Sequence, residues 1–244
     1  MKSLLSLAAA GALILGSNAM AIDPAQLSQS LMDSSRSAAD KELDDSRKPV
    51  EVLDYLGLEE GMTVIDFMAG AGWFSEVLAR AVGDDGKVYL QNSTGGFARG
   101  NTAETTAERI SRLGNIERLE ADVTATGLPD NSVDFAITNL NFHDIYNRDA
   151  DAGVAFLMEV KRILKPGAIF GLIDHEGSLG ADNATLHRIA LDDALMAAHK
   201  AGLQVVGVSD ILDVEADDHS KGPFDPSLGR NTDRIILKLT KSGM

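Results

Sequence analysis

Cysteine is absent from this sequence of 244 residues. Its absence excludes disulfide bonds, a thiolate nucleophile, a cysteine-ligated zinc site and a lipid-modified cysteine. Basic residues are also few: 22 lysines and arginines stand against 37 aspartates and glutamates, which leaves a formal net charge of -15. No run of lysines or arginines offsets this balance. The charge argues against nucleic acid or an anionic membrane surface as a partner.

A hydrophobic run long enough to span a bilayer is missing as well. The apolar stretch Leu4–Leu15 is too short for a permanent membrane helix. It follows the positive Lys2 and precedes the small-x-small sequence Ala19-Met20-Ala21, a pattern typical of a cleavable signal peptide. We therefore predict a signal peptide at 1–21, export to the periplasm and no stable membrane insertion, with a mature chain that begins near Ile22.

No internal repeat and no low-complexity segment divides the rest of the chain. Residues 22–48 are polar and charged, which predicts a solvated N-terminal extension of one or two helices. The remaining residues, 49–244, are numerous enough for one α/β domain with a sizeable core.

The stretch from Met62 to Ser75 contains the most informative pattern. Met62–Phe67 is a short apolar run rich in β-formers, which predicts a buried strand. Asp66 near its end is followed by Gly70 and Gly72, and then by apolar residues at helical spacing. A strand, a glycine turn and a helix let a ligand lie against bare backbone at the helix N-terminus.

Two classes of nucleotide-binding protein use this arrangement, and each requires a glycine that is missing here. The dinucleotide fingerprint G-x-G-x-x-G needs a third glycine where this chain has Ser75. The spacing of Asp66, Met68, Gly70 and Gly72 is that of S-adenosylmethionine methyltransferases, with Met68 in place of the first glycine. An ordinary glycine turn remains a third interpretation of the turn alone.

Alternation of strands and helices predicts an α/β fold with a Rossmann-like, doubly wound, mostly parallel seven-stranded sheet. No helix separates the last two predicted strands, so we expect the last strand to run antiparallel. Residues 92–101 and 209–231 are expected loops, and the second is long enough for a lid or binding loop. The predicted strands are 62–67, 87–91, 116–119, 133–140, 168–174, 203–208 and 234–239, and the predicted helices after the glycine turn include 103–113, 153–164 and 185–201.

From Pro49 to Leu239 the sequence resembles a class I S-adenosylmethionine-dependent methyltransferase, and most closely a group of exported bacterial predicted methyltransferases. The stretches that carry the resemblance are Arg47-Lys48-Pro49, Val88 to Asn92, Gly171 to His175, Thr185 to Arg188 and Thr232 to Arg234.

The resemblance implies S-adenosylmethionine as cofactor. Asp66 and the glycine turn would hold its amino-acid end, the end of the second strand its ribose, and Asp122 its adenine amino group. The ribose position offers Gln91 and Asn92 in place of the usual acidic residue. The predicted cofactor-binding residues are Asp66, Met68, Ala69, Gly70, Ala71, Gly72, Gln91, Asn92, Asp122, Val123 and Asn139.

Four of the five histidines follow predicted strands, and His199 alone is expected at the opposite edge of the sheet. We predict that His143, His175 and His187 line one acceptor cavity beside the glycine turn, with His143 and His175 nearest the methyl group. The predicted catalytic residues are His143, His175 and Asp174, and the predicted substrate-binding residues are His187, Arg188, His219 and Arg234. Separate structural roles for the histidines, or a metal site that they form with Asp174, are the alternatives, and no metal is predicted.

The predicted function is methyl transfer from S-adenosylmethionine to an unidentified small molecule. Two other functions remain open: a non-catalytic protein that binds S-adenosylmethionine or a nucleoside with the same fold, and a nicotinamide oxidoreductase. Ser75 and the helix-free last connection weigh against the oxidoreductase.

Overall fold

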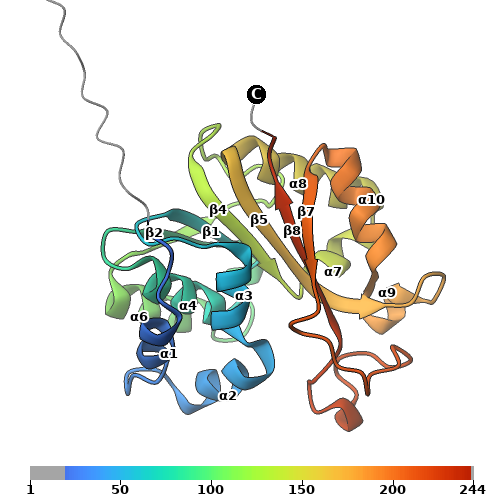
Figure 1. Ribbon diagram of the computed structural model, residues 1–244, viewed down its shortest axis with the longest axis horizontal. Coiled ribbons are helices and arrows are strands. Elements are labelled where there is room, and N and C mark those ends of the chain that lie inside the picture. The colour runs from blue at the N-terminus through green and yellow to red at the C-terminus, as the bar shows by residue number, and fades with distance from the viewer. Residues whose placement is uncertain (1–19, 243–244) are drawn as a thin grey trace, which may run out of the picture.

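The computed structural model describes residues 20–242, which form a mixed β-sheet with helices on both faces (Figure 1). Residues 1–19, which hold most of the predicted signal peptide, lie outside the described residues. The strands are β1 Thr63–Phe67, β2 Lys87–Asn92, β3 Ile116–Glu120, β4 Val133–Asn139, β5 Leu164–Gly177, β6 Ile189–Ala190, β7 Gln204–Ser209 and β8 Arg234–Thr240.

The seven long strands have the order β3-β2-β1-β4-β5-β8-β7, and the short β6 pairs with β5 outside this path. Strands β1 to β5 are parallel, whereas β8 runs antiparallel to both of its neighbours, β5 and β7. The predicted fold class is therefore confirmed, including the direction of the last strand. Because the parallel strands share one direction, the residues that follow β1, β2, β3, β4 and β5 gather at one edge of the sheet.

Helices cover both faces of this sheet. Their bounds are α1 Pro24–Leu31, α2 Ala38–Arg47, α3 Pro49–Leu56, α4 Trp73–Val82, α5 Thr94–Phe97, α6 Thr102–Leu113, α7 Phe142–Tyr146, α8 Ala150–Ile163, α9 Asn183–Leu186, α10 Leu191–Ala201 and the 3-10 turn η1 Pro226–Leu228.

Successive strand residues point to opposite faces, so each central strand contributes to two cores. Val64 of β1 and Phe135 of β4 belong to one core, with α3 and α4. Ile65 of β1 and Ala136 of β4 belong to the other, which α8 and α10 cover. Figure 1 shows α1, α4 and α6 together on one side of the sheet and α8 and α10 on the other.

The N-terminal extension packs on the same face as α4. The Asp23 side chain accepts hydrogen bonds at the start of α1, and the Ser37 side chain does so at the start of α2. Leu27 and Leu31 of α1 are buried in the core that α4 helps to form, whereas α2 buries no residue. The expected segment of one or two helices thus contains two, and α1 is anchored more firmly than a solvated helix.

Three local predictions were wrong. The single helix predicted at 185–201 is interrupted, because His187 adopts a left-handed φ of 51° between α9 and β6. The loop predicted at 92–101 contains the short helix α5, whose first turn is capped by Ser93. The strand predicted at 168–174 is much longer, because β5 begins at Leu164 and includes Pro166 and Gly167, residues that commonly interrupt strands. Within residues 20–242, no helix combines the length and apolarity needed to cross a membrane.

Candidate functional site

The turn between β1 and α4 exposes its backbone, as the sequence predicts. Met68, Gly70 and Gly72 all adopt positive φ, at 53°, 55° and 83°. A Cβ added to Gly72 would lie 2.8 Å from Leu90 Cδ1, so only glycine fits there. A Cβ added to Gly70 would meet nothing within 4 Å, which leaves open space beside this residue. Met68 holds the same left-handed conformation without being a glycine, a strained state for an L-residue.

Two amide side chains from the end of β2 hold this turn in place. Gln91 Oε1 accepts a hydrogen bond from Met68 N at 2.9 Å, and Gln91 Nε2 donates to Ala121 O at 2.8 Å. Asn92 Oδ1 accepts from Gly70 N at 2.9 Å, and Asn92 Nδ2 donates to Gly70 O at 3.0 Å. Each amide thus bonds the backbone through both its oxygen and its nitrogen, a role that the sequence did not indicate, and the prediction that they face the ribose hydroxyls stays a prediction. Gln91 is fully buried, whereas Asn92 still borders a cavity.

Asp66 is buried beneath the turn, and Ser75 donates a hydrogen bond to its Oδ2 at 2.6 Å. Burial raises the pKa of the Asp66 carboxyl to about 7, against the opposing effects of Ser75 and of the nearby Arg47 charge. Ser75 occupies the position of the third glycine in a dinucleotide fingerprint. The missing glycine is thus replaced by the hydrogen-bond partner of the buried acid.

A cavity of about 390 Å³, here called the loop cavity, lies between this turn and the N-terminal extension. Asp66, Met68 and Gly70 line one side of it, and Asn139 and His175 from the ends of β4 and β5 line another. The remaining wall comes from α2 and from the loop before β8, through Asp40, Leu43, Arg47, Phe224 and Arg230.

A second cavity of about 530 Å³, here called the strand-end cavity, continues around the other side of the turn. It shares Met68, Gly70 and Asn141 with the loop cavity and extends to the ends of β2 and β3 at Asn92, Asp122 and Val123. A larger hollow of about 680 Å³ lies at the start of β2 and β3, around Lys87 and Ile116. It is at the opposite edge of the sheet from the glycine turn, so it takes no part in this site.

Asp122 has a structural partner as well as a cavity position. Its Oδ1 accepts hydrogen bonds from Thr124 N at 2.8 Å and Thr124 Oγ1 at 2.7 Å. These bonds hold the pKa of Asp122 below its ordinary value, so the carboxylate stays ionised at neutral pH. Asp122 thus closes a turn with Thr124 and also lines the strand-end cavity.

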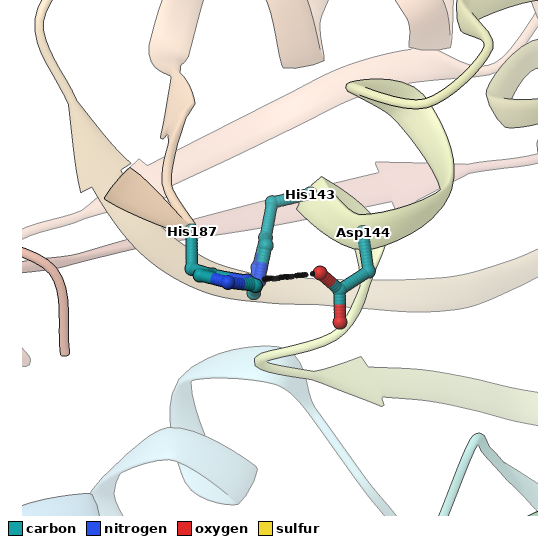
Figure 2. Close-up of side chains that lie close together, drawn as sticks. All are labelled: His143, Asp144 and His187. Atoms are coloured by element: carbon teal, nitrogen blue, oxygen red, sulfur yellow. Dashed lines mark hydrogen bonds and ion pairs between the residues drawn. The ribbon is translucent and has the colours of Figure 1, made fainter. Parts of the chain in front are cut away.

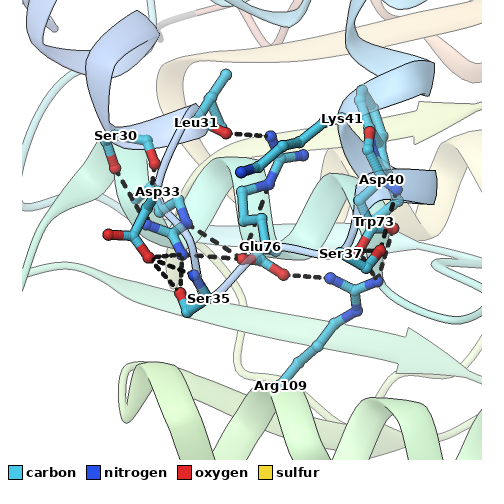
Figure 3. Close-up of polar contacts among 12 residues, drawn as sticks. Ser30, Leu31, Asp33, Ser35, Ser37, Asp40, Lys41, Trp73, Glu76 and Arg109 are labelled. Atoms are coloured by element: carbon cyan, nitrogen blue, oxygen red, sulfur yellow. Dashed lines mark hydrogen bonds and ion pairs between the residues drawn. The ribbon is translucent and has the colours of Figure 1, made fainter.

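Polar contacts of Arg109 and Trp73 hold the glycine turn against α2, and Figure 3 shows Arg109 beside Asp40 and Glu76. Arg109 of α6 donates from Nε to Ala71 O at 2.9 Å and from its terminal nitrogens to Asp40 and to Glu76. Trp73 Nε1 donates to Asp40 O at 2.9 Å. Because Asp40 belongs to α2, these bonds fix the extension over the cavity.

The histidines form a row but do not share one cavity. Ring centroids are 5.8 Å apart between His175 and His143 and 5.7 Å apart between His143 and His187. Only His175 lines the loop cavity. The prediction that all three line it was therefore wrong, because His143 is held inward by Asp174 and His187 faces Asp144.

Asp174 organises the two inner histidines. Its Oδ1 and Oδ2 accept bonds from His143 Nδ1 and His143 N, both at 2.7 Å, and Oδ1 also accepts from His175 N at 2.8 Å. His175 Nδ1 pairs with Thr232 Oγ1 at 2.6 Å. Burial, and then the charge of Arg234, lower the pKa of His175 to about 2, so its ring is neutral at neutral pH. Burial opposes protonation of His143, but the bond and charge of Asp174 raise its pKa overall.

His143, Asp144 and His187 converge on one point (Figure 2). His143 Nε2 lies 3.3 Å from Asp144 Oδ1, and His187 Nδ1 lies 3.1 Å from the same oxygen. One ligand atom from each residue lies within 4.8 Å of the others. Asp174 is not part of this group, because protein donors already occupy its oxygens. The metal site considered from the sequence contained Asp174, whereas the ligand atoms that converge in the structure include a carboxylate oxygen of Asp144 instead.

Two predicted substrate residues have structural roles instead. Arg188 is fully buried and makes bonds to Asp217 at 2.7 and 2.9 Å, to Glu176 O at 2.6 Å and to Lys221 O at 2.8 Å. His219 Nε2 pairs with Asp233 Oδ2 at 2.8 Å. Both residues tie down the 209–231 loop, and neither lines the loop cavity. The sequence shows that both residues are polar, but it does not show which residues they contact.

Arg234 remains at the site. It borders a third cavity of about 350 Å³, here called the arginine cavity, with Arg47, Arg230 and His175. The sequence-based site omitted Arg47, Arg230 and the α2 residues Asp40 and Leu43, because the extension was expected to be solvated. One available signal was Arg47 itself, which belongs to a stretch that carries the family resemblance.

Comparison with known proteins supports one interpretation of this geometry. A family model described as "Methyltransferase domain" matches residues 65–172, from the middle of β1 to the middle of β5. A ubiquinone/menaquinone biosynthesis C-methyltransferase of Escherichia coli is 28% identical over 115 residues, which cover 47% of this chain and 43% of the relative. The match thus spans less than half the length of that curated relative.

Solved structures cover more of the chain. A SAM-dependent methyltransferase from Aquifex aeolicus is 26% identical, with a TM-score of 0.61 over 90% of this chain and 98% of its own. A geranyl diphosphate C-methyltransferase from Streptomyces coelicolor A3(2) has the same TM-score over 91% of this chain and 90% of its own at 14% identity, a likeness of fold alone. A methyltransferase domain thus covers residues 65–172, the sheet order is that of the class I S-adenosylmethionine-dependent methyltransferase fold, and the domain and its structural neighbours indicate S-adenosylmethionine as the cofactor.

Proposed function

We propose that this chain transfers the methyl group of S-adenosylmethionine to a small molecule bound in the loop cavity and the adjoining arginine cavity. One observation carries the proposal. The glycine turn stands between the strand-end cavity and the loop cavity, and the loop cavity in turn shares His175, Arg47 and Arg230 with the arginine cavity. A nucleoside, its amino-acid end and an acceptor thus have adjoining spaces around one turn.

The residues around the turn fit the cofactor. The open side of Gly70 admits a ligand against the backbone, and Asp66 provides a buried acceptor below it. Asp122 and Val123 border the space where the nucleoside would lie. Gln91 and Asn92 support this arrangement indirectly, since they hold the turn in its left-handed conformation.

When bound, the cofactor supplies a methyl group on a positively charged sulfur, which is already activated for in-line displacement. The protein therefore needs mainly to position the acceptor and to exclude water. His175 is the histidine that faces the acceptor space, and Thr232 fixes its ring through Nδ1. Its low pKa favours a hydrogen-bonding role over general-base catalysis. His143 and Asp174 act as positioning residues, because they fix the end of β5 from which His175 projects.

The test of this proposal is calorimetry of the chain lacking residues 1–21 with S-adenosylmethionine, S-adenosylhomocysteine and NAD. A Gly70→Val variant places a branched side chain in the open space of the turn, and its affinity for S-adenosylmethionine should fall by about tenfold or more. Gly114→Val is the matched control, because Gly114 also has a positive φ and open space around its Cβ but lies at the end of α6. Equal affinities in the two folded variants would remove the cofactor site from this turn.

A non-catalytic protein that binds S-adenosylmethionine is the second candidate function. The supporting observation is that Gln91, in place of the usual acidic residue, bonds backbone groups through both its oxygen and its nitrogen. Release of S-adenosylhomocysteine with a panel of small acceptors would distinguish the two functions. Tight cofactor binding without release on any acceptor would favour the binding protein.

Export is a separate part of the proposal, motivated by the charged, apolar and small-residue pattern of residues 1–21. A reporter that is active only outside the cytoplasm should become active when fused to residues 1–30, with cleavage after Ala21. Mass spectrometry of the native protein provides an independent check, and an intact N-terminus would contradict the proposal.

A further inference from the structure

Three arginines from distant parts of the sequence meet at the arginine cavity. Arg47 ends α2, Arg230 lies in the loop before β8, and Arg234 begins β8. The arginine cavity shares Leu43, Arg47, Leu140, His175 and Arg230 with the loop cavity, so the two spaces are continuous. A group held by these arginines would therefore extend toward the glycine turn.

These guanidiniums lack the acidic partners that other arginines of the chain possess. Within residues 20–242, none of the three forms an ion pair with a carboxylate. Arg234 is only 2% exposed; its terminal nitrogens donate to Ser46 O and Arg230 O, while its Nε has no partner. A buried cation with an unused donor is costly unless an anion joins it.

Aromatic rings support the other two guanidiniums without neutralising them. The Arg47 guanidinium lies 4.5 Å from the Trp73 ring centre, and that of Arg230 lies 4.9 Å from the Phe224 ring centre. A guanidinium stacked on a ring keeps its edge available for two hydrogen bonds to an oxyanion. Burial, and then the charge of Arg47, lower the pKa of Arg234 to about 10, so it remains a cation at neutral pH.

This positive cavity is exceptional in a chain with a net charge of -15. We propose that the methyl acceptor carries an oxyanion, a carboxylate or a phosphate, that Arg47, Arg230 and Arg234 bind together. The proposal rests on the proposed function, since it names the chemical class of that acceptor. The carboxylate of the cofactor is the other possible source of an oxyanion, but Arg234 lines the arginine cavity and not the loop cavity. Arg234 is therefore the residue that distinguishes the two sources.

The experiment measures binding of pyrophosphate and of citrate to the chain saturated with S-adenosylhomocysteine, at constant ionic strength. Arg230→Gln and Arg234→Gln should each weaken oxyanion binding by about tenfold or more, and Arg234→Gln, outside the loop cavity, should change the affinity for S-adenosylhomocysteine by less than about threefold. Arg118→Gln is the matched control, because Arg118 is an exposed arginine of β3 that pairs with Glu120. Arg230 is itself exposed, so its variant keeps the test valid even if Arg234→Gln does not fold.

Each result is decisive. Oxyanion binding that is equal in all variants, or absent while S-adenosylhomocysteine binds, would overturn this inference and leave the proposed function intact. Competition between the oxyanion and S-adenosylhomocysteine would assign the arginines to the cofactor carboxylate and also overturn it. Failure of S-adenosylhomocysteine to bind at all would overturn the proposed function itself.

Discussion

Two groups of arginines lie near α2, and they differ in one respect. On the α4 side, the buried carboxylate of Glu76 pairs with Arg109, as Figure 3 shows, and also with Arg36, Arg80 and Arg112. On the β8 side, Arg47, Arg230 and Arg234 surround a cavity, with no carboxylate of residues 20–242 paired to them. The first group neutralises its own charge and the second does not.

The difference separates a structural role from a binding role. Glu76 joins α4 to α6 and to the segment between α1 and α2, so its ion pairs hold the extension against the domain. Burial would raise the pKa of Glu76, but the bonds and charges of Arg112 and Arg109 lower it to about 2. The positive charges of the three arginines in the second group repel one another, and a bound oxyanion would offset that repulsion. An arginine cluster thus indicates a ligand only where its internal partners are missing.

The largest expected effect comes from removal of the shared carboxylate. Glu76→Gln leaves four arginines without their buried partner, and we expect the free energy of unfolding to fall by about 3–5 kcal/mol. Urea denaturation measures this change, with Glu104→Gln, an exposed substitution on α6, as the control. A loss no greater than in the control would show that the network contributes nothing to stability.

A smaller effect is expected on the pH dependence of folding stability, which should have opposite signs for the carboxylates of Glu76 and Asp66. The pKa of Glu76 lies below its ordinary value of 4.5, so its contribution to stability is complete above about pH 5 and is lost as the pH falls toward 2. The pKa of Asp66, near Arg47, is raised from 3.8 to about 7, so folding favours its protonated form. Stability attributable to Asp66 therefore decreases as the pH rises from about 4 to 7.

Asp66→Asn tests this opposite sign. The variant should be more stable than the native chain at pH 7, by on the order of 2 kcal/mol, and no more stable near pH 4. Thermal unfolding across this pH range checks the prediction, while calorimetry should show weaker binding of S-adenosylmethionine. A stability difference that does not change with pH would mean that Asp66 is already ionised in the folded chain.

The smallest expected effect comes from a substitution that gives the second group of arginines an acidic partner like that of the first. Leu43 borders both the loop cavity and the arginine cavity, so Leu43→Glu supplies the carboxylate that the three arginines lack. Compared with the uncharged control Leu43→Gln, it should stabilise the fold by about 1 kcal/mol or less and abolish binding of pyrophosphate. Pyrophosphate that binds equally to both variants would separate the oxyanion site from these arginines.

Periodicity along the sequence was enough to predict the sheet and the turn. Apolar runs such as Met62–Phe67 mark buried strands, and the missing helix before 234–239 correctly predicts an antiparallel last strand. These signals are local, because the direction of a side chain from a strand or helix is set by its place in the chain. Gly70 and Gly72 are informative for the same reason, since a left-handed backbone conformation is a property of single residues.

The partners of polar side chains were decided only by the tertiary structure. Gln91 and Arg188 are residue types expected at a ligand site, yet Gln91 bonds the backbone and Arg188 bonds Asp217. Arg47 and Arg234 are 187 residues apart in sequence, and one cavity brings them together. An arginine carries the same charge whether it is paired or not, so sequence alone does not distinguish an arginine in a structural ion pair from one in a binding site. Packing decides it, because packing determines which carboxylates come within reach of each cation.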